Sequence, residues 1–240
     1  MPEFLIEAII QWKCTLMPAR IVPFALYFVF IGLDEGLHYL VSAGLIALPL
    51  NTFLLLYPLK ILTIGVALWY FRHDYTELQW SDWFQWPYTI FSIALGVVVF
   101  LLWIKMTWPF AIFGTVQGYD PTSIQQDSAR IAVIASRLFG ASIVVPIMEE
   151  LFWRSFMVRY IIKPEFEKVP VGVFTITSFV ISAILFGMEH NLWLAGIMAG
   201  VVYNFVLYKT KSIAQCILAH AVTNGSLGVY VLSTQSWYFW

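Results

Sequence analysis

Three charged residues stand close together inside a strongly apolar run of the sequence. Glu149, Glu150 and Arg154 fall within six consecutive positions. A charge in the middle of a membrane helix costs from about 2.5 to more than 10 kcal/mol, so it rarely occurs there without a partner or a task. Glu150 and Arg154 are four positions apart and can pair on one helix face. Glu149 points about 100° away, which leaves a carboxylate suited to accept a proton from water.

Two further polar pairs occur on later apolar segments. Phe186 and His190 are four positions apart, next to a helix break expected at Asn191. His220 and Asn224 also share a helix face, and both can donate hydrogen bonds to an oxyanion, at about 2.7–4 kcal/mol per donor. His190 alone could equally be a hydrogen-bonded core residue, and the second pair alone could join two helices by hydrogen bonds. Together, a carboxylate base, a histidine that helps to hold water and two donors are the groups that amide hydrolysis requires.

The composition indicates an integral membrane protein. Of 240 residues, 60% are hydrophobic and 11% are charged, whereas soluble domains contain about 25% charged residues. No ten-residue segments of alternating polarity occur, so an all-α helical bundle is favoured over a barrel. The apolar residues extend from end to end, which predicts one integral membrane domain over residues 1–240. The net charge of −1 argues against nucleic acid as a partner.

We predict a polytopic bundle of about seven transmembrane spans, with a range of six to eight, plus an amphipathic interfacial helix. The apolar runs are residues 21–33, 52–71, 88–104, 139–162, 171–190, 192–208 and 212–232. Residues 128–138 carry Arg130 and Arg137 on one face, which suits the membrane surface. Residues 4–17 are also expected to form an interfacial or partly inserted helix, and residues 107–126 form a loop.

Loop lysines and arginines predict a cytoplasmic N-terminus, because cytoplasmic loops carry an excess of both. With that orientation, His190 lies near the outer end of its helix and Glu149 lies nearer mid-depth. If both belong to one site, some helices must be short, tilted or broken. Glu189, beside His190, is expected to face elsewhere.

Three ordered motifs on successive apolar segments resemble those of the CPBP family of intramembrane glutamic endopeptidases, also called the ABI family, which includes the type II CAAX prenyl endopeptidases. The motifs are Glu149-Glu150-xxx-Arg154, Phe186-xxx-His190 and His220-xxx-Asn224. The resemblance covers residues 128–235, which we expect to form the catalytic core.

This resemblance implies a role for each motif. Glu149 is expected to activate a water molecule together with His190. His220 and Asn224 are expected to form the oxyanion hole. The supporting residues are Glu150, Arg154 and Phe186. The family's reaction implies no metal and no other cofactor.

Neighbouring residues further resemble the bacterial subfamily called CAAX prenyl protease-related, which is associated with exosortase systems. The similar stretches are residues 57–60, 152–156, 189–196 and 218–224 and the tryptophan-rich tail. The resemblance implies a protein of the bacterial cytoplasmic membrane that cuts a membrane-associated protein or lipidated peptide near its C-terminal region. Exosortase-system proteins are then possible partners. Whether the substrate is prenylated stays open.

Three alternatives stay open at this point. Glu149, His190 and His220 could bind zinc as a His2Glu set, although no HExxH motif occurs. Ser142 with His220 could act as in a rhomboid-like serine protease. The polar cluster could instead serve a catalytically inactive scaffold or a transporter. An aspartyl protease is excluded, because it needs two membrane aspartates and only Asp120, in a loop, has a suitable neighbourhood.

Overall fold

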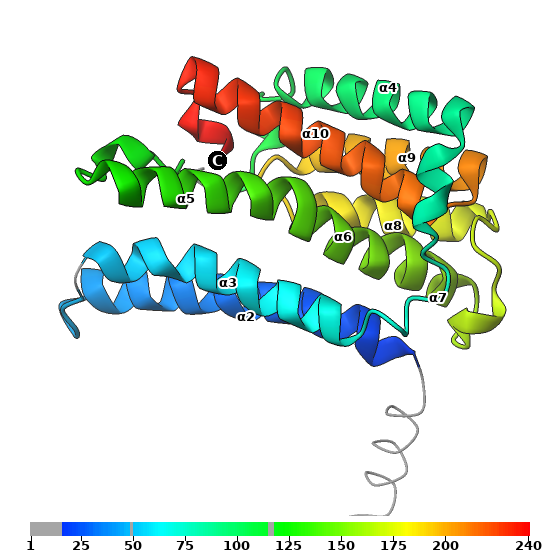
Figure 1. Ribbon diagram of the computed structural model, residues 1–240, viewed down its shortest axis with the longest axis horizontal. Coiled ribbons are helices and arrows are strands. Elements are labelled where there is room, and N and C mark those ends of the chain that lie inside the picture. Colours follow the sequence, from blue (N-terminus) through cyan, green and yellow to red (C-terminus); the bar gives the residue numbers. More distant parts are fainter. Residues whose placement is uncertain (1–15, 49, 115–117) are drawn as a thin grey trace, which may run out of the picture. The chain divides into compact units, whose positions relative to one another are not determined.

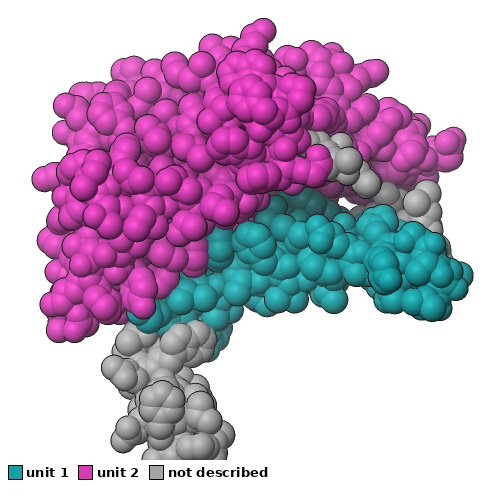
Figure 2. All heavy atoms as spheres, turned by 180° about the vertical axis from the view of Figure 1, so that it is seen from behind, with its two compact units in different colours: residues 1–75 teal, residues 76–240 magenta. Residues whose placement is uncertain are grey.

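The computed structural model describes residues 16–48, 50–114 and 118–240. These residues form helices and loops and no strands, which confirms the all-α prediction. The chain divides into two compact units, residues 1–75 and 76–240, which are coloured separately in Figure 2. The expectation of a single domain stays a prediction. Residues 4–15 of the predicted interfacial helix lie outside the described residues.

The first unit contains two packed helices, α2 (Met17–Ser42) and α3 (Leu50–Tyr70). The predicted end of the first span at Leu33 is wrong, because α2 continues to Ser42. The reason is local. Asp34 and His38 are exposed and lie one turn apart, with Nε2 of the histidine 3.9 Å from the carboxylate. The charged side chains therefore point outward and do not interrupt the helix.

The second unit holds the remaining helices in a bundle (Figure 1). They are α4 (Trp86–Trp103), α5 (Asp127–Phe139), α6 (Val145–Glu150), α7 (Val158–Ile162), α8 (Ile176–Met188), α9 (Trp193–Thr210) and α10 (Ile213–Thr234). Helix α10 packs against α4, α6 and α9, and α8 packs against α9. The last helix therefore connects α4, α6 and α9.

Helices α5, α6 and α7 belong to one continuous helical segment, Asp127–Ile162. Two π-helical stretches interrupt its α-helical geometry, Gly140–Val144 and Leu151–Met157, on either side of α6. Wide turns of this kind inside α-helices are frequent at functional sites. They flank the two glutamates at positions 149 and 150. The amphipathic stretch 128–138 is the first part of this segment and not a separate helix.

Within the described residues, four helices are long and apolar enough to cross a membrane, and the protein is an integral membrane protein. They are Met17–Ser42, Trp86–Trp103, Asp127–Ile162 and Ile213–Thr234. The predicted number of about seven is not confirmed. Helix α8 has 13 residues, or about 20 Å at 1.5 Å per residue, whereas the hydrocarbon core is about 30 Å thick.

Small residues bring α8 and α9 into close contact. A Cβ atom added at Gly187 lies 2.3 Å from Cγ1 of Ile197, and one added at Gly196 lies 2.8 Å from Cα of Gly187. Further along, a Cβ on Gly200 lies 3.0 Å from Cα of Ala183. Small residues at such positions let helix backbones approach closely inside a membrane. This seam fixes the loop between α8 and α9, which carries His190.

We predict that Gly187→Ala destabilises the protein by about 1–3 kcal/mol, the usual range for overpacking. The matched control is Gly65→Ala, where an added Cβ meets no described atom within 4 Å and alanine favours the helix by up to about 1 kcal/mol. Denaturant unfolding of the purified protein in detergent measures both changes. Equal stability of the two variants contradicts the close α8–α9 contact.

Candidate active site

Glu150 and Arg154 pair as their spacing predicts. Nη1 of Arg154 lies 3.1 Å from Oε1 of Glu150, and both side chains are at most 1% exposed. Nη2 of the same arginine donates to the carbonyl of Gly200 at 3.3 Å, and the guanidinium lies 4.4 Å from the ring centroid of Phe186. Arg154 therefore connects its own helix to α8 and α9.

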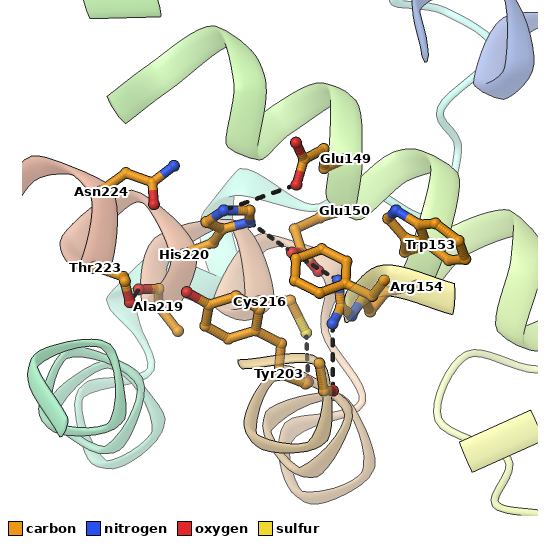
Figure 3. A network of polar contacts seen from close by, with 12 residues as sticks. Glu149, Glu150, Trp153, Arg154, Tyr203, Cys216, Ala219, His220, Thr223 and Asn224 are labelled. Carbon is orange, nitrogen blue, oxygen red and sulfur yellow. Dashed lines mark hydrogen bonds and ion pairs between the residues drawn. The ribbon is translucent and has the colours of Figure 1, made fainter. Parts of the chain in front are cut away.

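His220 extends this network to α10. Its Nδ1 lies 2.8 Å from Oε1 of Glu150, and its ring stacks on Tyr203 at 4.8 Å between centroids. Its other nitrogen, Nε2, faces Oε2 of Glu149 at 3.9 Å. Figure 3 shows the two neighbouring glutamates approaching the two sides of this one imidazole. Glu150 holds the ring in place, and Glu149 stands opposite its second nitrogen.

His190 lies just beyond the end of α8. Its Nδ1 is 2.8 Å from the carbonyl oxygen of Phe186. Because a carbonyl oxygen only accepts, Nδ1 carries the proton, and Nε2 of a neutral ring is an acceptor. The ring also contacts Trp103, with centroids 5.3 Å apart. Since α8 is too short to cross the membrane, His190 and mid-helix Glu149 can share one site.

Glu149, Glu189 and His190 form a close group, in which one side-chain ligand atom from each lies within 4.8 Å of the others. Oε2 of Glu149 and Oε2 of Glu189 are buried and accept no hydrogen bond from the part of the chain that the structure describes. The other oxygen of Glu189 accepts from Nε1 of Trp153 at 3.0 Å. The expectation that Glu189 faces elsewhere is wrong. Helix α8 ends at Met188, so helical periodicity does not extend to Glu189.

Asn224 lies one turn after His220 on α10. Its Nδ2 donates to the carbonyl of Ala141 at 2.9 Å, and Figure 3 shows its carboxamide on the same side of α10 as the imidazole. An amide group has two N–H donors. One is used by Ala141, and the second is available to a ligand.

Tyr203 is a further residue of this group that the sequence prediction left out. Its ring supports His220 and lies 5.3 Å from the guanidinium of Arg154. The sequence spacing could have indicated that Tyr203 faces the site. Gly196, Gly200 and Tyr203 recur at helical spacing on one face of α9, the face that packs against α8.

This geometry bears on two of the alternatives, the zinc site and the rhomboid-like serine protease. The group close enough to share a metal ion contains Glu189 in place of His220, so the geometry favours Glu149, Glu189 and His190 over the alternative His2Glu set. A serine nucleophile needs a base within hydrogen-bond reach. Oγ of Ser142 is buried without a hydrogen-bond partner among the described residues, so the structure does not support a rhomboid-like site.

Part of the chain matches a protein-family model. Residues 131–226 match the model described as type II CAAX prenyl endopeptidase Rce1-like. The searches of curated proteins and of solved structures gave no match. The Rce1-like segment covers less than half of the chain, and it includes Glu149, His190, His220 and Asn224. This match does not identify the exosortase-associated subfamily, so membership of that subfamily stays a prediction.

We predict that Arg154→Met destabilises the protein by about 3–5 kcal/mol, because it leaves Glu150 as a buried charge without its ion pair. The double variant Glu150→Gln/Arg154→Met recovers most of this loss, since both charges are removed together. Denaturant unfolding in detergent measures the series. The matched control is the exposed pair of Lys163 and Glu165, whose double neutralisation changes stability by less than about 1 kcal/mol. A double variant as unstable as Arg154→Met contradicts the paired role.

Proposed function

We propose that the protein is an intramembrane endopeptidase of the glutamic type, which hydrolyses a peptide bond in or beside the bilayer. The observation that carries the proposal is the position of Glu149. Its carboxylate lies in a buried site, near Nε2 of His220 and grouped with His190. Both histidines and the glutamate fall within the segment that matches the Rce1-like family model.

In this proposal Glu149 is the general base. A water molecule sits between Glu149 and His190 and gives its proton to the carboxylate as it attacks the peptide carbonyl. Nε2 of His190 accepts the second hydrogen of the water, because Nδ1 already donates to Phe186. The hydrogen bond to Phe186 also fixes the plane of the imidazole. The site therefore orients the water before the substrate arrives, and positioning a reactant in advance lowers the activation barrier.

Two donors stabilise the oxyanion that forms. Asn224 offers its second N–H, and His220 offers Nε2–H. Because Nδ1 of His220 is hydrogen-bonded to Glu150, the ring carries protons on both nitrogens when Nε2 donates. Donors fixed before the reaction are worth about 2.7–4 kcal/mol each. Collapse of the tetrahedral intermediate then returns the proton from Glu149 to the leaving amine, and the peptide bond breaks.

The resemblance to the exosortase-associated subfamily supports a narrower proposal for the substrate. The enzyme cuts a membrane-associated protein or lipidated peptide near its C-terminal region, in the bacterial cytoplasmic membrane, with its own N-terminus in the cytoplasm. Exosortase-system proteins are proposed as partners. The reaction as written uses no metal and no other cofactor.

The test is incubation of the purified protein in liposomes with membrane proteins from its host, followed by mass spectrometry of new peptide termini. We expect the wild type to generate termini that Glu149→Ala does not. The variant Glu165→Ala, which removes an exposed carboxylate, controls for nonspecific effects and produces the wild-type termini. Identical termini with wild type and Glu149→Ala favour an inactive scaffold or transporter.

We predict that Asn224→Ala lowers kcat by about 10²–10³-fold, the loss measured when one oxyanion donor is removed. The neighbouring variant Thr223→Val is the control, because Thr223 donates to the carbonyl of Gly96 at 2.9 Å and joins α10 to α4. That variant lowers the melting temperature and leaves kcat within about threefold of wild type. Cleavage kinetics and thermal unfolding of the same preparations separate the two effects. A kcat of Asn224→Ala equal to that of Thr223→Val contradicts the oxyanion role.

A further inference from the structure

Glu189 is a half-buried acidic group that the proposed reaction does not use. It lies close to Glu149 and adds a third carboxylate to Glu149 and Glu150. Glu150 is compensated by Arg154 and His220. Glu149 and Glu189 have no arginine or lysine in contact within the described ranges, and each keeps one buried oxygen without a hydrogen bond.

The charges of this cluster do not balance. Three ionised carboxylates and one guanidinium give a net charge of −2 with neutral histidines (−3 + 1 = −2), and of −1 when His220 carries protons on both nitrogens (−3 + 1 + 1 = −1). Two like charges repel strongly where water is scarce. A single divalent cation between Glu149 and Glu189 removes both the repulsion and the excess charge.

The ligand atoms are placed for such an ion. One atom each from Glu149, Glu189 and His190 lies within 4.8 Å of the others. Bonds of about 2.0–2.2 Å to oxygen and nitrogen bring neighbouring ligands about 3–4 Å apart. Small rotations of the glutamate side chains are enough to close the remaining difference. Glu189 and His190 are half-buried, so the ion has a route in.

The outer contacts of these ligands are those of a metal site. A histidine that binds a metal usually donates its other ring N–H to a carbonyl or a carboxylate, and ligating carboxylates are themselves hydrogen-bonded. His190 donates from Nδ1 to Phe186, which leaves Nε2 as the ring nitrogen that can bind an ion. Trp153 donates to the second oxygen of Glu189. These two hydrogen bonds favour a metal site independently of the closeness of the acidic groups.

We propose that Glu149, Glu189 and His190 bind one divalent first-row cation. Two carboxylates suit Mn²⁺ and an imidazole suits Zn²⁺, so the mixed set accepts either ion. Binding needs only these three side chains and does not rest on the proposed function. Where that function holds, the ion and the base are alternatives, because the oxygen of Glu149 that takes the proton becomes a ligand. The bound ion therefore competes with the metal-free reaction.

The test uses untagged full-length protein in detergent, stripped with a chelator and then titrated calorimetrically with Zn²⁺ and separately with Mn²⁺. We expect the wild type to bind one equivalent of either ion. Glu189→Gln weakens binding by more than tenfold, and Trp153→Phe, which removes the hydrogen bond to Glu189, weakens it by about 10–100-fold. The matched control Glu165→Gln binds like the wild type. Thermal unfolding verifies that each variant is folded.

Two results overturn the proposal: a wild type that binds neither ion, or a Glu189→Gln variant that binds as tightly as wild type. The readout uses no peptide, so it is separate from the test of the proposed function. Binding without cleavage supports the metal site and counts against the peptidase. Cleavage without binding supports the peptidase and counts against the metal site.

Discussion

The structure of the second unit depends on the burial of one arginine. Arg154 is 1% exposed, and a charge at such a position is tolerated only with partners, because membrane burial of an unpaired charge costs several kcal/mol. Its partners come from three other places in the fold: Glu150 one turn earlier, the carbonyl of Gly200 on α9 and the ring of Phe186 on α8. Satisfying one guanidinium therefore fixes how these helices stand relative to one another.

The same network gives two adjacent glutamates, Glu149 and Glu150, different contacts. Glu150 is completely buried and bonded to both Arg154 and His220, so its carboxylate is held by structural contacts. Glu149 projects from a different side of the helix and faces Nε2 of His220 across 3.9 Å. Arg154 thus pairs with Glu150, and among the described residues no arginine or lysine forms an ion pair with Glu149. Two identical side chains in neighbouring positions therefore differ in their surroundings: Glu150 is the counter-charge of Arg154, and Glu149 is the proposed base.

Much of this site is predictable from sequence, because it rests on helical spacing. The pairing of Glu150 with Arg154 and the shared face of His220 with Asn224 follow from intervals of four residues. The role of Glu189 does not, since α8 ends one residue earlier and the chain turns. The number of spans is also hard to predict. The apolar run 171–190 is long enough to look like a span, whereas the helix that it contains, α8, has 13 residues and is too short to cross the membrane. Whether two segments distant in sequence meet depends on contacts such as the glycine seam of α8 and α9, which no local pattern specifies.

Glu149 is proposed to act in catalysis, whereas Glu150 is proposed to stabilise the fold. Replacing each glutamate with the isosteric, neutral glutamine tests this difference most directly. Stability in detergent and peptide cleavage are measured on Glu149→Gln and Glu150→Gln side by side. The account predicts that Glu149→Gln is at least as stable as wild type and cleaves nothing, whereas Glu150→Gln loses about 3–5 kcal/mol because Arg154 is left without its counter-charge. A Glu149→Gln variant that still cleaves, or a Glu150→Gln variant as stable as wild type, contradicts it.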